Sequence, residues 1–270
     1  ETFTFCSWHF GGYERKLQEP NLSNYIPMVY RNEPSYYRNG LQVDVAMIKV
    51  PQMDKHGYFN FSLTNSATRA ILETAKVVIV ETDENLPVAL GGREECIHLS
   101  EVDFVVEGEN RNLFELPDGA SDDIDRKAAA YVVEEIADGS VIQLGIGGMP
   151  NAVGNMIADS DVRDLGIHTE MLVDAYLKMF EAGKVTNRRK QIDRGKGVWT
   201  FCMGSKRLYE WIDHNPFLAS YPVDYTNDPA VIAQNDNFVS VNNCIEVDLY
   251  GQVSSESSGV RQISGSGGQL

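Results

Sequence analysis

The chain has 270 residues, 43% of them hydrophobic and 23% charged, which excludes a disordered tail and a collagen-like repeat. Its 23 basic and 39 acidic residues give a net charge of −16 at pH 7, so the molecule as a whole repels nucleic-acid phosphates. A small anion is not excluded, because a local pocket can oppose the overall field. No apolar run approaches the roughly 20 residues of a membrane-spanning helix, and no signal peptide is visible. We therefore expect neither a nucleic-acid partner nor a membrane partner.

Short β-branched runs alternate with helical stretches along the chain, which predicts an α/β fold. Several of these runs are almost continuously apolar, as expected of strands that are buried on both faces of a sheet. The predicted strands cover residues 43–50, 76–81, 141–144, 198–202 and 237–241. The predicted helices cover residues 65–75 and 122–137, and the second has an acidic first turn and a glycine, Gly139, after its end.

Proline, glycine and small polar residues gather at residues 116–121, which indicates a domain boundary. We therefore expect two α/β segments, residues 1–120 and 121–270. The chain starts without Met and stops in a glycine-rich turn, and turns of this kind connect two elements. These features predict a piece of a longer protein.

The four cysteines lie far apart in the sequence and form neither a C-x-x-C pair nor a metal-ligand spacing. They are Cys6, Cys96, Cys202 and Cys244. This pattern is typical of reduced, buried thiols in a cytoplasmic protein.

A glycine-rich turn directly follows the predicted strand 141–144. Its residues are Gly145, Ile146, Gly147, Gly148 and Met149. It is expected to open a helix that reaches Ile157, with Pro150 near the first helical position. Backbone N–H groups at such a helix start can face a bound oxygen or phosphate. A dinucleotide fingerprint is an alternative, although Pro150 occupies its third glycine position, and a plain tight turn is another.

A second candidate segment, residues 166–171, contains His168 and Glu170 between two expected helices. Single residues of these types are usually structural. The H-x-E pair resembles part of a zinc deaminase signature, but no P-C-x-x-C follows, so we expect no metal site.

Two further segments stand out, the glycine-rich residues 263–269 after a strand-like run at 245–249, and the basic stretch 184–196. Glycine richness alone is a weak signal. The basic stretch is either a solvated loop or a contact for an anionic ligand.

Taken together, these segments resemble the acetyl-CoA hydrolase/transferase family, in particular its 4-hydroxybutyrate and butyryl-CoA:acetate CoA-transferases. The resemblance covers essentially the whole chain. Residues 51–58 are similar to the family's P-x-x-D-x-H-G-[YF] turn, and residues 97–103 to its H-[VL]-S-[ED]-[IV]-D segment. The most specific matches are residues 143–153, 165–171 and 263–270, in the family's order. The chain departs from the family at residues 172–175, which lose the serine and the glycine of the usual S-D-G, and this departure alters the expected shape of the substrate pocket.

The resemblance implies two related α/β domains of the CoA-transferase type, with the active site in the cleft between them. It implies that Glu170 is the nucleophile and that the turn from Gly145 to Met149 supplies donors for an oxyanion and for CoA. Ile245, Gly267 and Gly268 are implied as further CoA contacts. Asn227 is implied either to bind the substrate carboxylate or to orient Glu170.

The implied activity is the transfer of CoA from a short-chain acyl-CoA to acetate or a similar carboxylate through a glutamyl-CoA thioester. Acyl-CoA hydrolysis is the nearest alternative, and a non-enzymatic nucleotide-binding module is a more distant one. No permanently bound cofactor is expected, because coenzyme A is a substrate. The expected partners are an acyl-CoA, a carboxylate and further copies of the chain in a homo-oligomer.

Overall fold

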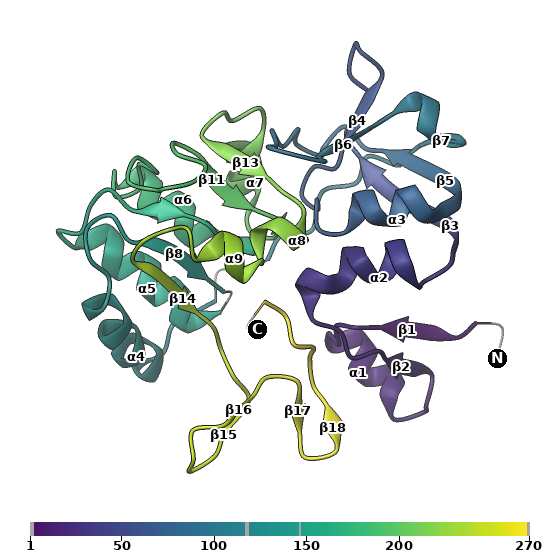
Figure 1. Cartoon of the computed structure of the whole chain (residues 1–270). Helices are drawn as coiled ribbons and strands as arrows, with labels where there is room; N and C mark the ends of the chain where they lie inside the picture. The colour runs from purple at the N-terminus through teal and green to yellow at the C-terminus, as the bar shows by residue number, and fades with distance from the viewer. Residues whose placement is uncertain (1–2, 117–118, 146, 269–270) are drawn as a thin grey trace. The chain divides into compact units, whose positions relative to one another are not determined.

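A computed structural model describes residues 3–116, 119–145 and 147–268 of the chain. The chain divides into two compact units, which are described separately below (Figure 1). The smaller unit combines Glu1–Glu33 with Asn242–Leu270, and the larger unit is Pro34–Val241.

The smaller unit joins the two ends of the sequence. Its elements are β1 (Phe5–Ser7), α1 (Gly12–Gln18), β2 (Ser23–Tyr25), the 3-10 helix η1 (Tyr30–Asn32), β15 (Glu246–Val247), β16 (Val253–Ser254), β17 (Ser257–Ser258) and β18 (Arg261–Gln262). Strands β1 and β2 pair in parallel, whereas β15–β16 and β17–β18 are antiparallel. The Arg15 guanidinium donates to the Ile263 carbonyl at 2.6 Å, and the Ser266 hydroxyl donates to the Met28 carbonyl at 2.8 Å. These bonds hold the two terminal segments together.

The first half of the larger unit is built on a three-stranded parallel sheet in the order β3-β5-β7. Its elements are α2 (Glu33–Asn39), β3 (Val43–Val50), β4 (Tyr58–Asn60), α3 (Thr68–Thr74), β5 (Ala75–Thr82), β6 (Cys96–His98), the 3-10 helix η2 (Leu99–Glu101) and β7 (Phe104–Glu107). The predicted strands here are confirmed, the first with its predicted bounds, and the predicted helix at 65–75 begins three residues later than expected.

The expectation that these strands are buried on both faces is wrong for this sheet. Val78 and Val80 of β5 are buried, but the opposite face carries Met47 at 76% exposure and Phe104 at 59%. Met47 and Phe104 flank Ile79 in the parallel register, so they lie on the same face. An apolar run in the sequence therefore does not decide how many faces of its strand are covered.

Two family-like segments of the sequence meet in the antiparallel pair β4–β6. Gly57 has a φ of +88°, and a Cβ on it would lie 2.9 Å from Nε2 of His98. The His98 Nδ1 atom and the Ser100 hydroxyl are 2.8 Å apart. Asp54 accepts the N–H groups of His56 and Tyr58, each at 2.8 Å. These residues are used to close a turn, so this part of the motif is structural.

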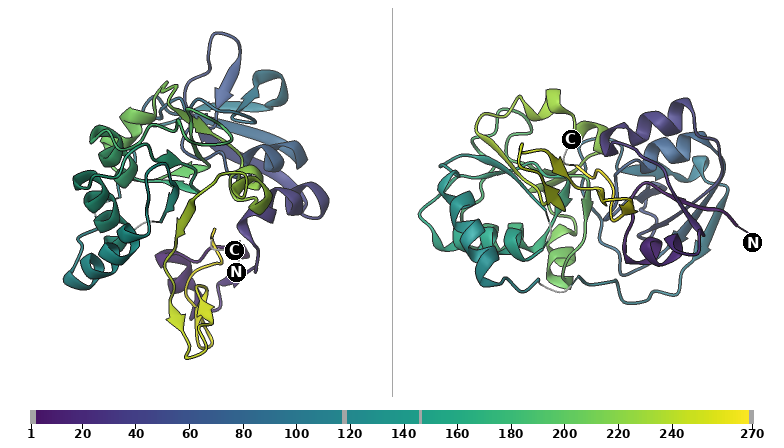
Figure 2. Two further views of the ribbon diagram at one scale, coloured as in Figure 1. Left: turned by 60° about the vertical axis from the view of Figure 1, so that its left-hand side comes forward. Right: turned by 90° about the horizontal axis from the view of Figure 1, so that it is seen from below.

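The second half of the larger unit contains a parallel sheet in the order β14-β8-β9. Its elements are α4 (Asp123–Glu134), β8 (Val141–Leu144), α5 (Gly148–Asp159), β9 (Gly166–Ile167), β10 (Met171–Leu172), α6 (Asp174–Glu181), β11 (Gly197–Trp199), β12 (Phe201–Cys202), α7 (Lys206–Ile212), β13 (Leu218–Ser220), α8 (Val223–Thr226), α9 (Pro229–Ile232) and β14 (Phe238–Val241). Helices α4 and α5 pack side by side along this sheet (Figure 2). The α/β class is confirmed.

Helix α4 begins one residue after the predicted start, with Asp122 as its N-cap accepting the N–H groups of Ile124 and Asp125. It ends at Glu134, three residues before the predicted end at 137, and its C-cap is Glu135. Helix α5 starts at Gly148, so Pro150 occupies its third position and not its first. The predicted strand at 198–202 is two short strands, β11 and β12, which are interrupted at Thr200.

The four cysteines carry free thiols, but the expectation that all are buried is wrong. Cys6 and Cys244 are exposed, Cys96 is half-buried, and Cys202 is buried. Burial raises the pKa of the Cys202 thiol well above its usual range, with the nearby Asp174 carboxylate adding to the shift. In the part of the chain that the structure describes, no helix is both long and apolar enough to cross a membrane.

Candidate active site

The segments that carry Glu170 and the glycine loop leave the same edge of one sheet. Strands β8 and β9 are parallel neighbours. The glycine loop follows the end of β8. His168, Thr169 and Glu170 follow the end of β9. Ligands of open α/β sheets bind beyond the carboxyl ends of the strands. This edge is therefore where a site is expected on topological grounds.

The Glu170 carboxylate is paired with a neutral amide. Nδ2 of Asn227 donates to Oε2 of Glu170 at 2.6 Å. Asn227 directly follows α8 and is 6% exposed. Burial raises the pKa of Glu170, and the hydrogen bond from Asn227 opposes that shift. The carboxylate is thus held in a defined direction with little of the hydration that would lower its reactivity.

The backbone of Glu170 is fixed by the interruption between β11 and β12. Its carbonyl accepts the N–H groups of Thr200 at 3.1 Å and of Phe201 at 3.2 Å. Two successive N–H groups can converge on one carbonyl because the strand is broken there. The break that the sequence does not predict therefore anchors the predicted nucleophile.

His168 connects the Glu170 segment to the residue before Asn227. Its Nε2 lies 2.8 Å from the carbonyl oxygen of Thr226 and donates a hydrogen bond to it. Burial, followed by the charge of Lys190, lowers the pKa of His168 to about 4. The ring is neutral at physiological pH, so His168 is a structural donor in this network.

The glycine loop begins helix α5. Gly147 is its N-cap with a φ of +120°, a conformation that favours glycine. Among the described backbone–backbone hydrogen bonds outside the helices and strands, none is donated by Gly148 or Met149. A Cβ on Gly145 would find only the Val241 carbonyl oxygen, at 4.0 Å, among the described neighbours. The first N–H groups of a helix have no partner within the helix, so the start of α5 can present donors to an anion at its positive end. The Asp125 carboxylate packs close to this start, because a Cβ on Gly148 would collide with its Oδ2 atom. Ile146 lies outside the described residues.

The other predicted CoA contacts belong to the smaller unit. The backbone N–H of Ile245 donates to the Ser254 carbonyl at 2.8 Å, and its side chain is 38% exposed. Gly267 has a φ of +56°, and described atoms leave the space around its Cα open. Gly268 lies in the same turn. Their assignment to CoA remains a prediction.

Most of the basic stretch 184–196 is committed to contacts within the larger unit. Lys184 donates to the Ser160 carbonyl and Lys196 to the Pro216 carbonyl. Arg189 forms an ion pair with Asp164 at 3.1 Å. Lys190, at 2% exposure, is buried inside the unit. Several basic side chains of this stretch therefore stabilise the fold through contacts within the unit.

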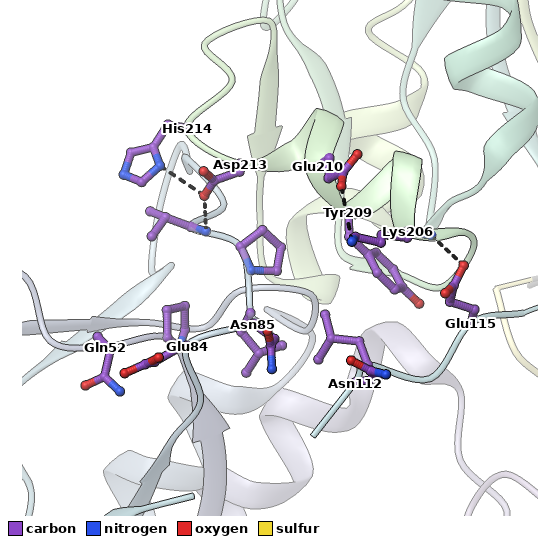
Figure 3. A pocket seen from close by; sticks show the side chains of 15 residues that line it. Gln52, Glu84, Asn85, Asn112, Glu115, Lys206, Tyr209, Glu210, Asp213 and His214 are labelled. Carbon is purple, nitrogen blue, oxygen red and sulfur yellow. Dashed lines mark hydrogen bonds and ion pairs between the residues drawn. The ribbon is translucent and has the colours of Figure 1, made fainter. Parts of the chain in front are cut away.

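A separate cavity of about 630 Å³ lies between loops of the first sheet and α7 (Figure 3). None of the predicted site residues that the structure describes lines it. Its ionisable residues are mostly acidic: Glu84, Glu115, Glu210 and Asp213 face Lys206 and His214. Such a lining repels the phosphates of CoA, so this cavity does not suit the predicted substrate.

Comparison with known proteins identifies the class of this chain. The acetyl-CoA hydrolase/transferase N-terminal domain matches residues 11–113, and the corresponding C-terminal domain matches residues 204–270. The chain belongs to the acetyl-CoA hydrolase/transferase family, as its motifs predict.

Two of the relatives that this chain matches are named CoA-transferases. The chain is 53% identical to a butyryl-CoA:acetate CoA-transferase of Anaerostipes caccae, over 99% of this chain and 60% of that protein. It is 41% identical to a 4-hydroxybutyrate coenzyme A transferase of Clostridium kluyveri, over 96% of this chain and 60% of that protein. The structure of RipA from Yersinia pestis matches with a TM-score of 0.89 at 35% identity, over 94% of this chain and 59% of that one. The chain thus spans about 60% of the relatives that it matches.

Proposed function

We propose that the protein is a CoA-transferase that moves CoA from a short-chain acyl-CoA, of the butyryl or 4-hydroxybutyryl type, to acetate or a similar carboxylate. The observation that carries this proposal is the half-buried Glu170 carboxylate, bound by Asn227 at 2.6 Å and attached to the same sheet edge as the glycine loop. The activities for which the two relatives described above are named support the substrate class.

The proposed reaction needs no redox step and no net proton transfer. An ionised Glu170 oxygen attacks the thioester carbon, the C–S bond breaks, and a mixed anhydride and CoA thiolate form. The thiolate then attacks the glutamyl carbonyl, which forms a glutamyl-CoA thioester and releases the donor's carboxylate. The acceptor carboxylate reverses both steps. No permanently bound cofactor is required, because CoA enters and leaves as part of the substrates.

The surrounding groups have separate roles in this proposal. The N–H groups at the start of α5 stabilise the negative oxygen of the tetrahedral intermediate, and removing one such donor typically costs about 3–4 kcal/mol. Asn227 holds Glu170 in the direction of attack without neutralising its charge. Ile245, Gly267 and Gly268 are proposed as further CoA contacts.

Hydrolysis is the competing outcome of the same chemistry. Water in place of the acceptor carboxylate would release free CoA from the intermediate, and exclusion of water is a property of the closed site. The two activities therefore have to be separated by measurement.

The deciding experiment uses the protein at its full natural length with butyryl-CoA and isotopically labelled acetate. We expect labelled acetyl-CoA to form much faster than free CoA, and the peptide that contains Glu170 to carry CoA during turnover. Glu170→Gln is the matched control, since it keeps the side-chain volume and removes the nucleophile. Release of free CoA without labelled acetyl-CoA would establish a hydrolase. If neither labelled acetyl-CoA nor free CoA is formed, the proposal is wrong.

Three broader expectations stay with this proposal. The division at residue 120 falls in the connection between β7 and α4, with one parallel sheet on each side of it. We propose that it separates the two family domains, although both sheets belong to the larger compact unit. A homo-oligomeric assembly and a cytoplasmic location are also proposed.

A further inference from the structure

One segment of the larger unit contacts both the strand that leads to Glu170 and the helix that leads to Asn227. This segment comprises residues 187–196, and we refer to it as the brace. It lies within the basic stretch of the sequence, but two of its most buried polar contacts are made by Lys190 and Asn187, each at most 2% exposed.

The first end of the brace is fixed to β9. Nζ of Lys190 donates to the Ile167 carbonyl at 2.9 Å and to the Lys196 carbonyl at 2.7 Å. Oδ1 of Asn187 accepts the Ile167 N–H at 2.8 Å. Both backbone polar groups of Ile167 are therefore held by side chains of the brace. Glu170 follows three residues later.

The stem of Lys190 reaches this position over a glycine. A Cβ on Gly166 would lie 2.7 Å from Cγ of Lys190, which is closer than real Cβ contacts. The bare backbone of Gly166 thus lets the lysine pass and place its ammonium group beneath the end of β9. Burial lowers the pKa of Lys190 to about 8, so the group remains largely protonated at neutral pH.

The second end of the brace holds two tyrosines on either side of the start of α8. Asp193 accepts the hydroxyl of Tyr221 at 3.0 Å and that of Tyr225 at 2.8 Å, one on each carboxylate oxygen. The two rings stack with centroids 4.4 Å apart and an interplanar angle of 19°. Tyr225 lies in the last turn of α8, two residues before Asn227. Asp193 therefore fixes the element that ends at the partner of Glu170.

We propose that Asp193, anchored through Lys190, is a positioning residue that sets Asn227 against Glu170. The inference rests on the proposed function for its kinetic consequence, but its geometric content concerns only the Asn227–Glu170 pair. The path runs from Asp193 through Tyr225 to the end of α8. There the Thr226 carbonyl is tied to His168 and the Asn227 amide to Glu170. Asp193 itself need not contact a substrate.

The test is a double-mutant cycle of Asp193→Asn and Asn227→Ala in the full-length protein. Asp193 has a φ of +47°, and asparagine tolerates that conformation, so the substitution removes the charge and one acceptor without new strain. We expect Asp193→Asn to lower kcat about tenfold with KM changed less than about twofold. In the Asn227→Ala background the same substitution should change kcat less than about twofold, because the Asn227 side chain through which Asp193 acts is absent. Equal losses in both backgrounds would overturn the proposal.

Matched variants separate positioning from general destabilisation. Tyr225→Phe should reproduce part of the loss, whereas Tyr131→Phe, which removes a hydroxyl from a 73% exposed side chain of α4, should not. If Asp193→Asn lowers the melting temperature but leaves kcat per folded molecule unchanged, the residue is only structural and the proposal is wrong.

A second readout does not depend on the reaction. Carbon-13 NMR of glutamate-labelled protein follows ionisation of the Glu170 carboxyl group with pH. Because the Asn227 hydrogen bond lowers the pKa of Glu170, Asp193→Asn should raise that pKa in the same direction as Asn227→Ala. An unchanged titration would overturn the positioning role even if the protein proved not to be a CoA-transferase. If the wild type shows no CoA transfer but Asp193→Asn still shifts the titration of Glu170, only the proposed function is overturned.

Discussion

The two parallel sheets of the larger unit each end in a carboxylate, buried at Asp83 and half-buried at Glu170, and the two carboxylates have different partners. Asp83 follows β5 and is 1% exposed; it accepts the Asn85 N–H at 3.0 Å and lies 3.3 Å from Nζ of Lys49. Glu170 follows β9 and is bound by the neutral amide of Asn227. A cation opposite Asp83 compensates its charge, whereas the described side-chain partner of Glu170 is an uncharged amide. The comparison distinguishes a carboxylate that stabilises a turn from one that is available to react.

The largest expected effect separates these two carboxylates. Glu170→Gln should reduce transfer at least about 1,000-fold, because an amide cannot attack the thioester. The same change relieves the cost of burying a charge. The folded-state pKa of Glu170 is raised, so its ionisation disfavours folding as pH rises through that value, and the variant should gain stability at neutral pH but not at acid pH.

Asp83→Asn is the counterpart in the first sheet. It should lower the free energy of unfolding by about 1–2 kcal/mol through the weakened contact with Lys49, with turnover per folded molecule unchanged. Melting temperature and turnover on the same samples test both variants. A catalytic loss at Asp83 equal to that at Glu170 would remove the distinction between them.

The second effect contrasts a glycine at the end of each sheet. A Cβ on Gly108, after β7, would lie 2.5 Å from the Thr82 carbonyl oxygen, whereas a Cβ on Gly145, after β8, would make an ordinary contact at 4.0 Å with the Val241 carbonyl oxygen. Gly145→Val should therefore lower turnover about 100-fold, the scale of a lost oxyanion donor, with little change in stability. Gly108→Ala should do the reverse. Normal turnover of the Gly145 variant would exclude its loop from the site.

A smaller effect is expected from the amide that distinguishes Glu170 from Asp83. Asn227→Ala should lower kcat/KM about tenfold at neutral pH, the scale of one misaligned group. Because the lost hydrogen bond lowers the pKa of Glu170, the acid limb of the pH–rate profile should move to higher pH. A pH–rate profile that keeps its limb, with only the plateau reduced, would show that Asn227 contacts substrate and does not tune Glu170.

The smallest effect concerns the faces of the two sheets. Met47 of β3 is 76% exposed and Ile142 of β8 is fully buried. Met47→Ala should change the free energy of unfolding by less than about 0.5 kcal/mol, whereas Ile142→Ala should cost about 2–5 kcal/mol. Denaturant titration of the full-length protein measures both. A large cost at Met47 would show that its face is covered in the native protein.

The sequence predicts the strands well because β-branched runs such as residues 43–50 and 141–144 are local signals. It also predicts Glu170, Asn227 and the glycine loop, but through family resemblance and not through their chemistry. The hydrogen bond between Glu170 and Asn227 joins residues 57 positions apart, and no local pattern encodes it. The sequence also does not reveal that one face of the first sheet is exposed. Val77 and Ile142 lie in similar apolar runs and differ only in what packs on them.

The brace was missed for a related physical reason. In the sequence, Asp193 is one acid within a basic stretch, and Lys190 has the appearance of a solvated cation. The usable signal is the four-residue spacing of Tyr221 and Tyr225 across the start of α8, where their rings stack. Their common acceptor becomes evident only when the chain has folded.

The contact of Lys190 with Gly166 constrains the order in which this sequence can change. A mutation that adds any side chain at position 166 meets the lysine stem at once, so it is unfavourable while residue 190 keeps its length. A shorter residue at 190 can come first, although it leaves the Ile167 carbonyl without its ammonium donor. A lineage that loses Gly166 should therefore already carry a smaller side chain at position 190. Reconstructed ancestors of such a lineage should show the replacement at 190 before the replacement at 166.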